Sequence, residues 1–198
     1  MKLTDIKRQN ILRAAKSAFG KNGFTNANMS NIAADANVSK RTLYNHFSSK
    51  EQLFTEILKD NHKMVTDRPE FHYRPEIPIT EQFMQIVMAD LEFKDNIYDV
   101  NLTRTIVMEF MRRPEYAQSL ITELYSRNGF YYWLKDAVAD KALIIESIDD
   151  ACLLYKSMFN GFFLWPQVIT SLPEVDEATR LRQVKLIVSS FLTNYLPK

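Results

Sequence analysis

The sequence predicts an all-α protein made of two helical domains, residues 1–60 and residues 61–198. Glycine is scarce, with four residues among 198, and the alternation of apolar and polar residues that marks strands is hard to find. Apolar residues recur instead at helical spacing along nearly the whole chain. Three prolines between residues 66 and 80 disfavour a continuous helix, so the domain junction is expected there.

The first helix is predicted over residues 5–21, and a short second helix over residues 30–36. Gly23 should end the first helix, because glycine readily adopts the left-handed conformation of a helix C-cap. Asn28 and Ser30 are both candidates for the N-cap of the second helix. The apolar face of the first helix consists of Ile11, Leu12, Ala15 and Phe19.

A tight turn at Asn37 and Val38 leads to a third helix, predicted over residues 39–47. Ala33 is small where two helices must cross closely, and Val38 can fill the turn between them. Two short helices joined by a sharp turn form a helix-turn-helix, whose second helix enters the major groove of DNA. We therefore expect the N-terminal domain to be a three-helix, helix-turn-helix DNA-binding domain.

A fourth helix should begin near Lys50, with a capping box formed by Ser48 and Glu51 or by Ser49 and Gln52. Its apolar face contains Leu53, Phe54, Ile57 and Leu58. Helical periodicity resumes beyond the proline-rich junction. The further helices are expected over residues 80–95, 97–113, 115–138, 147–165 and 176–195.

The outward face of the third helix is polar, basic and free of acidic residues. Arg41 or Lys40 can donate to guanine O6 and N7, and Asn45 can pair with the edge of adenine. Tyr44, His46 and Lys50 are suited to phosphate oxygens, and Ser30 stands near the start of the second helix. The predicted DNA-binding residues are Ser30, Ser39, Lys40, Arg41, Thr42, Tyr44, Asn45, His46 and Lys50.

Charge is distributed unevenly between the two parts of the chain. Residues 1–60 contain ten Lys or Arg and five Asp or Glu, a net charge of +5, which leaves −4 on the rest. A basic end favours a polyanionic partner.

The cysteine count and the apolar runs bear on localisation. The single cysteine excludes an intrachain disulfide. The chain has no signal-peptide core and no apolar run of membrane length, so we expect a cytoplasmic protein.

The run FTNANMSNIAADANVSKRTLYNHFSSKEQLF resembles the N-terminal signature of the tetracycline-repressor (TetR) family. The shared features are a glycine followed by an aromatic residue, an Ile-Ala pair, a turn valine, a Ser-x-x-Thr-Leu-Tyr helix and a Ser-Lys-Glu-x-Leu segment. Asn37 stands where the family commonly has glycine, and asparagine tolerates the left-handed conformation there. The resemblance implies that Tyr44 and Lys50 clamp phosphates while residues 39–46 read bases.

The same resemblance implies a C-terminal domain that binds a small effector. The segments EFMRRPEYAQSL and MFNGFFLW are similar to the AefR-like subgroup of the family. Methionines and aromatic residues concentrate in this part and can line an adaptable pocket for an apolar or aromatic effector, although each of them also suits a core. The candidate ligand-binding residues are Met108, Met111, Tyr132, Tyr155, Phe159, Phe162 and Phe163.

The last two predicted helices are the expected surface of a homodimer. Two copies related by a two-fold axis would bind a palindromic DNA operator, with half-sites roughly 34–36 Å apart or at a multiple of that spacing. The alternative is that this face packs only within its own chain. The candidate dimerisation residues are Phe159, Leu181, Val184, Val188, Phe191 and Leu192.

These features predict a ligand-responsive transcriptional repressor that leaves its operator when an effector binds. Activation by the same architecture, or helical partner binding without DNA readout, remain the alternatives. The chain has no HExxH, no CxxC and no glycine-rich phosphate loop, so neither an enzyme nor a cofactor or metal site is expected. Cys152 lies among apolar residues and is interpreted as a buried, inert thiol.

Overall fold

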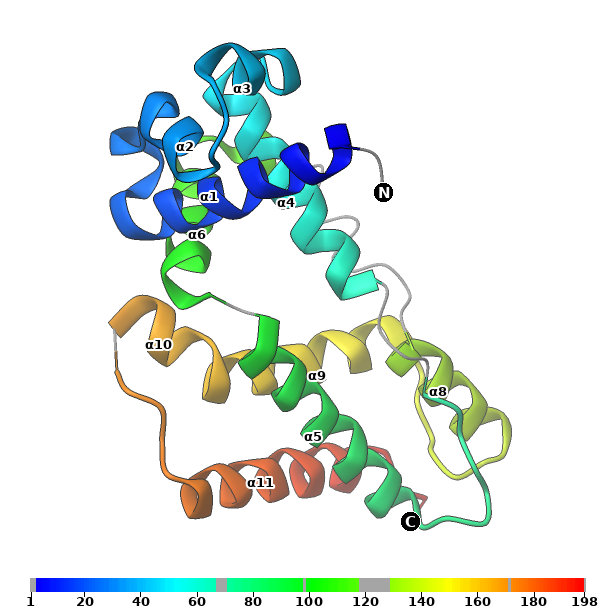
Figure 1. The fold of residues 1–198 in the computed structure, drawn as a ribbon. Helices are drawn as coiled ribbons and strands as arrows, with labels where there is room; N and C mark the ends of the chain where they lie inside the picture. The colour runs from blue at the N-terminus through cyan, green and yellow to red at the C-terminus, as the bar shows by residue number, and fades with distance from the viewer. Residues whose placement is uncertain (1–2, 67–70, 98, 118–128, 171, 198) are drawn as a thin grey trace. The chain divides into compact units, whose positions relative to one another are not determined.

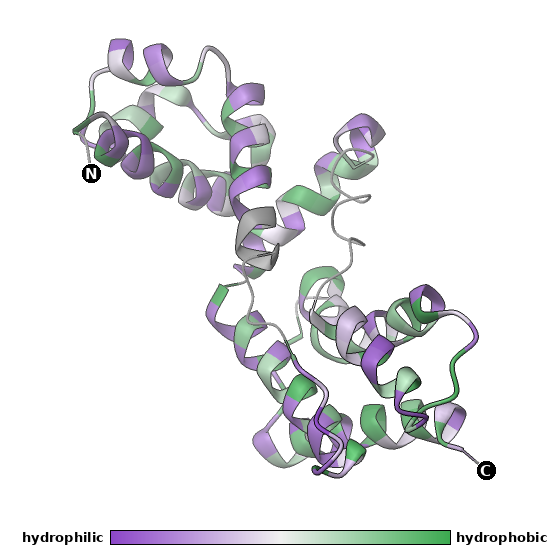
Figure 2. Ribbon diagram, turned by 90° about the vertical axis from the view of Figure 1, so that its right-hand side faces the viewer, coloured by the Kyte–Doolittle hydropathy of each residue, from purple (hydrophilic) through white to green (hydrophobic). Residues whose placement is uncertain are grey.

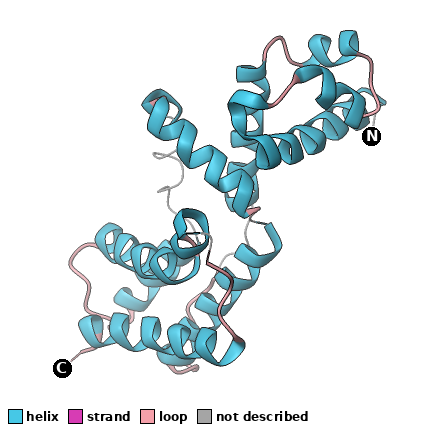
Figure 3. Cartoon of the chain, turned by 90° about the vertical axis from the view of Figure 1, so that its left-hand side faces the viewer, coloured by secondary structure: helices cyan, strands magenta, loops and turns pink. Residues whose placement is uncertain are grey.

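A computed structural model of the chain describes residues 3–66, 71–97, 99–117, 129–170 and 172–197. All regular elements in these ranges are helices, which confirms the predicted all-α class (Figures 1 and 3). Hydrophilic and hydrophobic residues alternate along the helices in Figure 2, as expected of amphipathic helices. The helices are α1 Leu3–Asn26, α2 Met29–Asp35, α3 Lys40–His46, α4 Lys50–Thr66, α5 Ile79–Ile97, α6 Val100–Arg112, α8 Gly129–Ala139, α9 Ile148–Phe163, α10 Trp165–Thr170 and α11 Glu177–Tyr195.

The chain packs into two compact units. The first contains residues 1–67 and 99–126, and the second contains residues 68–98 and 127–198. Helix α6 therefore belongs to the first unit, whereas the sequence grouped its residues with the C-terminal part. The division at residue 60 stays a prediction about domains, and the packing adds α6 to the helices that build the N-terminal core.

The core of the first unit is aromatic at its centre. The rings of Phe19 and Phe54 meet edge to face with centroids 5.6 Å apart, and Phe24 lies 5.1 Å from Phe54. Phe24 reaches this position because α1 breaks at Gly23, whose φ of 72° and ψ of 170° are extended rather than left-handed helical, a conformation that essentially only glycine adopts. The predicted end of the first helix is thus confirmed as a kink that turns the next aromatic side chain inward.

Helix α6 packs directly along α1. A methyl group added at Gly20 would stand 3.4 Å from the backbone nitrogen of Leu102, so a small residue permits this approach. The buried hydroxyl of Thr105 donates to the carbonyl oxygen of Phe19 at 2.9 Å. Leu102 is itself part of the N-terminal core. These contacts, rather than any local signal in the sequence, make α6 part of the first unit.

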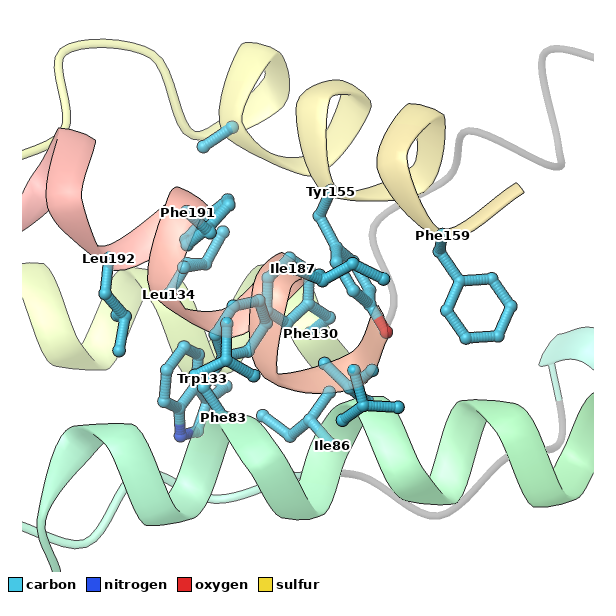
Figure 4. Close-up of a cluster of buried hydrophobic side chains, with 14 of the residues drawn as sticks. Phe83, Ile86, Phe130, Trp133, Leu134, Tyr155, Phe159, Ile187, Phe191 and Leu192 are labelled. Atoms are coloured by element: carbon cyan, nitrogen blue, oxygen red, sulfur yellow. The ribbon is translucent and has the colours of Figure 1, made fainter. Parts of the chain in front are cut away.

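The second unit is organised around a cluster of stacked aromatic side chains from α5, α8, α9 and α11 (Figure 4). Phe83 lies within 6 Å of Phe130, Trp133, Tyr155 and Phe191 between ring centroids. Such contacts add to the free energy gained by burying the rings. Phe83 therefore lies at the centre of this cluster together with Phe130, whose ring is within 6 Å of the same neighbours.

Polar contacts fasten the beginning of α5 to the turn before it. The buried amide of Gln82 donates to the carbonyl oxygens of Arg74 and Ile77 and accepts from the amide of Arg74. It also accepts from the indole nitrogen of Trp133 at 3.2 Å. One side chain therefore satisfies several buried groups, as buried polar atoms require.

The predicted boundaries of the C-terminal helices agree with the structure to within a few residues, with one difference. Residues 147–165 were expected in one helix, but α9 ends at Phe163 and a short helix α10 begins at Trp165. Pro166 lies in the first turn of α10, where its missing N–H costs no hydrogen bond. Part of the helix expected over residues 115–138 lies outside the described residues.

Candidate nucleic-acid interface

Helices α2 and α3 form the predicted helix-turn-helix. Asn28 is the N-cap of α2, and its side-chain oxygen accepts from the amide of Ser30 at 2.7 Å. In the turn, Asn37 has a φ of 54°, and the amide of Val38 donates to the carbonyl of Ala33 at 2.9 Å. The left-handed turn residue is therefore present although it is asparagine instead of glycine.

Helix α3 is held by one apolar side and one capping residue. Leu43 and Phe47 are almost fully buried in the N-terminal core. Ser39 is the N-cap, and its Oγ accepts from the amide of Thr42 at 3.0 Å while also bonding Thr42 Oγ1 at 2.8 Å. These two hydroxyls pair with each other, so the cap fixes the start of α3. The predicted contact of Thr42 with a base would then be made by its methyl group.

The opposite side of α3 presents most of the predicted base-reading residues to solvent. Lys40, Arg41, Tyr44 and Asn45 are exposed, and the Tyr44 side chain has 51% of its surface accessible. His46 is half-buried in the last turn of the helix. The structure therefore brings the predicted residues of α3 together on one acid-free face, while their roles toward DNA stay predictions.

Lys50 has a structural role that the sequence did not reveal. Its ammonium donates to the carbonyl oxygens of Thr25 at 2.9 Å and Ala27 at 3.1 Å, and it lies 4.9 Å from the centre of the Phe24 ring. An ammonium has three N–H donors, so one remains for a phosphate. The expected phosphate clamp stays a prediction, and the structure adds that Lys50 closes the end of α1.

The start of α4 is capped by Ser49, but the predicted capping box is only half formed. The amide of Gln52 donates to Ser49 Oγ at 3.1 Å, whereas Gln52 Oε1 accepts from the amide of the preceding residue, Ser48, at 2.6 Å. A complete capping box would have the Gln52 side chain bonded to the amide of the N-cap residue itself. This cap places Lys50 in the first turn of α4, beside the segment that joins α1 to α2.

Arg112 reaches the same segment from α6. Its guanidinium donates to Thr25 Oγ1 and to the buried carboxylate of Glu109, both at 3.1 Å. Glu109 has only 3% of its surface accessible, so its charge depends on this partner. Nothing local to α6 indicates that Thr25 lies beside Arg112, so this contact could not be predicted from the sequence.

The seven candidate ligand-binding residues are divided between the two units. Met108 and Met111 are on α6 in the first unit, where 47% and 81% of their surfaces are accessible. In the second unit Tyr132 is largely exposed, Phe162 is half-buried and the rest belong to the core: Tyr155, Phe159 and Phe163. A pocket formed by the five residues of the second unit stays a prediction.

The burial of α11 corrects the expected dimer surface. Val184, Val188, Phe191 and Leu192 are all at most 3% accessible and pack in the core of their own unit, so they cannot face a second chain. Of the six candidates, Leu181 is clearly exposed, at 44%. The helical spacing correctly identified a buried apolar face, but that face is covered from within the chain. The exposed sides of these two helices carry other large apolar residues, Leu186 on α11 and Leu153 on α9, which are 50% and 47% accessible.

Two family models match the chain. Residues 11–57 match bacterial regulatory proteins of the TetR family, and residues 81–197 match the C-terminal domain of AefR-like transcriptional repressors. The chain belongs to the TetR family. The second match covers more than half of the chain, and it extends the family assignment well beyond the helix-turn-helix.

Solved and curated relatives agree with this assignment. A crystal structure of a TetR family regulator from Pseudomonas syringae pv. tomato is 31% identical, with a TM-score of 0.83, and covers 99% of this chain and 100% of that one. The uncharacterized helix-turn-helix regulator YhgD of Bacillus subtilis is 33% identical over 44% of this chain. The repressor NicS of Pseudomonas putida is 30% identical over 60% of it. These matches span about half the length of the curated relatives, 46% of YhgD and 49% of NicS.

The described part of the chain contains neither a metal-binding group nor a reactive thiol. No group of three His, Cys, Asp or Glu side chains there could hold a metal ion. Burial raises the pKa of the Cys152 thiol to about 11, so this side chain stays protonated and unreactive near neutral pH. The helices that could be searched are too short or too polar to cross a membrane. The relatives described above are named as regulators and not as enzymes.

Proposed function

We propose that this TetR-family protein is a homodimeric repressor that binds a palindromic operator and leaves it when a small molecule binds the second unit. The observation that carries the proposal is the exposed, acid-free face of α3, held in place by Ser39 and by the buried side chains of Leu43 and Phe47. A rigid helix with donors on its free side suits the major groove. The match to AefR-like repressors supports repression rather than activation.

Arg41 and Asn45 are the proposed base readers, because both are exposed and their planar groups can make paired hydrogen bonds to a purine edge. Lys40, Tyr44 and His46 are the proposed phosphate ligands, together with the remaining donor of Lys50. Ser30 and Ser39 contribute by their positions at the starts of α2 and α3. Thr42 offers its methyl group to thymine.

The proposed dimer surface consists of the exposed sides of α9 and α11. Leu153 on α9 and Leu181 and Leu186 on α11 are large apolar side chains that the second unit leaves accessible. Burying them against a second copy would remove apolar surface from water. A two-fold dimer would then present two α3 helices to successive turns of one duplex.

Effector binding is proposed in the second unit, where Tyr155, Phe159, Phe162 and Phe163 supply an aromatic environment and Tyr132 is exposed on α8. An apolar or aromatic molecule is the expected effector. Thermodynamic linkage requires that an effector that weakens operator binding is itself bound less tightly by the DNA complex. A coupling free energy of about 3 kcal/mol would change operator affinity roughly 150-fold.

The test is selection of duplexes from a random DNA library by the full-length protein. Enrichment of a palindrome, with binding that weakens steeply as salt rises, is the expected result. A protein that enriches no sequence and binds heparin as well as any duplex would overturn the proposal. Analytical ultracentrifugation with and without the selected duplex would show whether one dimer binds each palindrome.

A further inference from the structure

A hollow of about 370 Å³ lies within the first unit, between the beginning of α1 and the exposed side of α3. Leu3, Thr4 and Lys7 line it from α1, and Thr42, Asn45 and His46 line it from α3. Figure 1 shows the first turns of α1 close to α3. The hollow therefore adjoins the face that we propose reads DNA, and half of its lining belongs to that face.

The lining suits an anion attached to a larger polar chain. It contains one ammonium group, one amide, one imidazole and two hydroxyls, with no carboxylate among the six residues. The hollow is open toward solvent rather than enclosed. A phosphate group with its adjoining sugar has the charge and shape that such a surface accommodates, and side-chain donors of these types bind phosphate oxygens in DNA complexes.

Lys7 differs from two other cations of α1 in having no carboxylate partner among the described residues. Arg8 is paired with Glu56 of α4, and Lys16 is paired with Asp60 at 2.6 Å. These pairs join α1 to α4, so their charges are already used within the fold. Lys7 lines the hollow instead, so its charge is available to a ligand there.

We propose that this hollow holds one phosphate of the operator strand in each half-site, with Lys7 as its cation. The inference rests on the proposed function and adds a residue of α1 to the DNA interface. Lys7 would contribute affinity and register without reading a base, because phosphates carry no sequence information. Asn45 and His46 would then contact the same strand from the end of α3.

The experiment compares the parent with Lys7→Gln, Lys7→Arg and Lys59→Gln. The probes are the palindromic duplex selected by the protein and an unrelated duplex of equal length, each titrated from low to high salt. Lys59 is the matched control, since it is an exposed lysine of α4 whose ion pair with Glu56 lies at the surface. It lies about 13 Å along the helix from Lys50. All variants are compared by thermal melting to confirm equal folding.

Lys7→Gln is expected to weaken binding to both duplexes about tenfold and to reduce the slope of log affinity against log salt by about two, one phosphate per head. Lys7→Arg should restore most of the slope, and Lys59→Gln should match the parent. Equal behaviour of Lys7→Gln and Lys59→Gln would overturn the inference while leaving the proposed function intact. Altered base preference in Lys7→Gln would also overturn it. Failure of the parent to select any duplex would instead reject the proposed function.

Discussion

The ammonium of Lys50 lies 2.9 Å from the carbonyl oxygen of Thr25, so the first turn of α4 is bonded to the end of α1. Arg112 of α6 donates to the hydroxyl of the same threonine at 3.1 Å. Three helices of the first unit thus meet at one residue, three positions before the N-cap of α2. Lys50, which the sequence predicts to bind phosphate, therefore also helps to hold the helix-turn-helix in position.

Replacing Lys50 by alanine should therefore lower both stability and DNA affinity. The loss of two charge-assisted hydrogen bonds at a partly exposed site is expected to reduce the free energy of unfolding by about 1 kcal/mol. Urea denaturation monitored by circular dichroism measures this change, and fluorescence anisotropy measures binding. Parental stability combined with a smaller salt slope would show that Lys50 serves phosphates and not the carbonyl groups.

Arg41→Ala should relax sequence preference at one base pair of each half-site. Arginine paired with a guanine edge discriminates against other bases by about 1–3 kcal/mol, and this discrimination disappears with the guanidinium group. Competition among duplexes substituted one position at a time measures the preference. A uniform loss of affinity, equal for every substituted duplex, would instead assign Arg41 to a phosphate.

Gly23→Ala should destabilise the first unit although the added methyl group meets no atom within 4 Å. The cost arises from the backbone, because a φ of 72° with a ψ of 170° is a conformation that essentially only glycine adopts, and another residue loses about 1–3 kcal/mol there. Gly161→Ala is the control, since Gly161 also leaves room for a methyl group but has no positive φ. Thermal melting should place Gly23→Ala below the parent and Gly161→Ala at or above it, and a Gly23→Ala protein that melts with the parent would contradict this explanation.

Phe191→Ala and Leu186→Glu, both on α11, should affect different properties of the protein. Phe191→Ala should lower its stability, and Leu186→Glu should weaken its dimer. Phe191 is fully buried in the core of the second unit, so its truncation should cost about 3–5 kcal/mol of stability. Leu186 is half-exposed, so Leu186→Glu should leave the stability of the fold nearly unchanged and weaken the dimer. Denaturation and sedimentation velocity separate the two effects. A Leu186→Glu protein that remains dimeric at low concentration would exclude Leu186 from the interface.

Acid should weaken the ion cluster that joins α5 to the start of α11. Burial of Asp95 acts to raise its pKa, but hydrogen bonds from Lys94 and Arg180 outweigh burial and hold the pKa below its usual value. A lowered pKa means that the native state favours the ionised carboxylate, so its contribution is present above about pH 4 and is lost as the pH falls further. Asp95→Asn should flatten the pH dependence of unfolding below pH 4, and a parental profile would contradict this.

Much of the helix-turn-helix could be predicted because its determinants are local. The apolar spacing of Ile32, Leu43 and Phe47, the N-cap preference of Ser39 and the turn at Asn37 are all readable within one or two helical turns, and the structure has each of them in place. The choice between Asn28 and Ser30 as N-cap was left open by the sequence. It depended on which side chain faces the free amides, and Asn28 does.

The sequence by itself determined most of the helices and the residues exposed on α3, since these follow from helical periodicity and from hydrogen bonds between near neighbours in the chain. Tertiary structure decided that α6 packs on α1, that Lys50 bonds to Thr25 and that Phe191 faces its own core. The physical reason is that an apolar stripe indicates burial without saying what covers it. Likewise a long cationic side chain takes its partner from whichever distant segment the fold brings within reach.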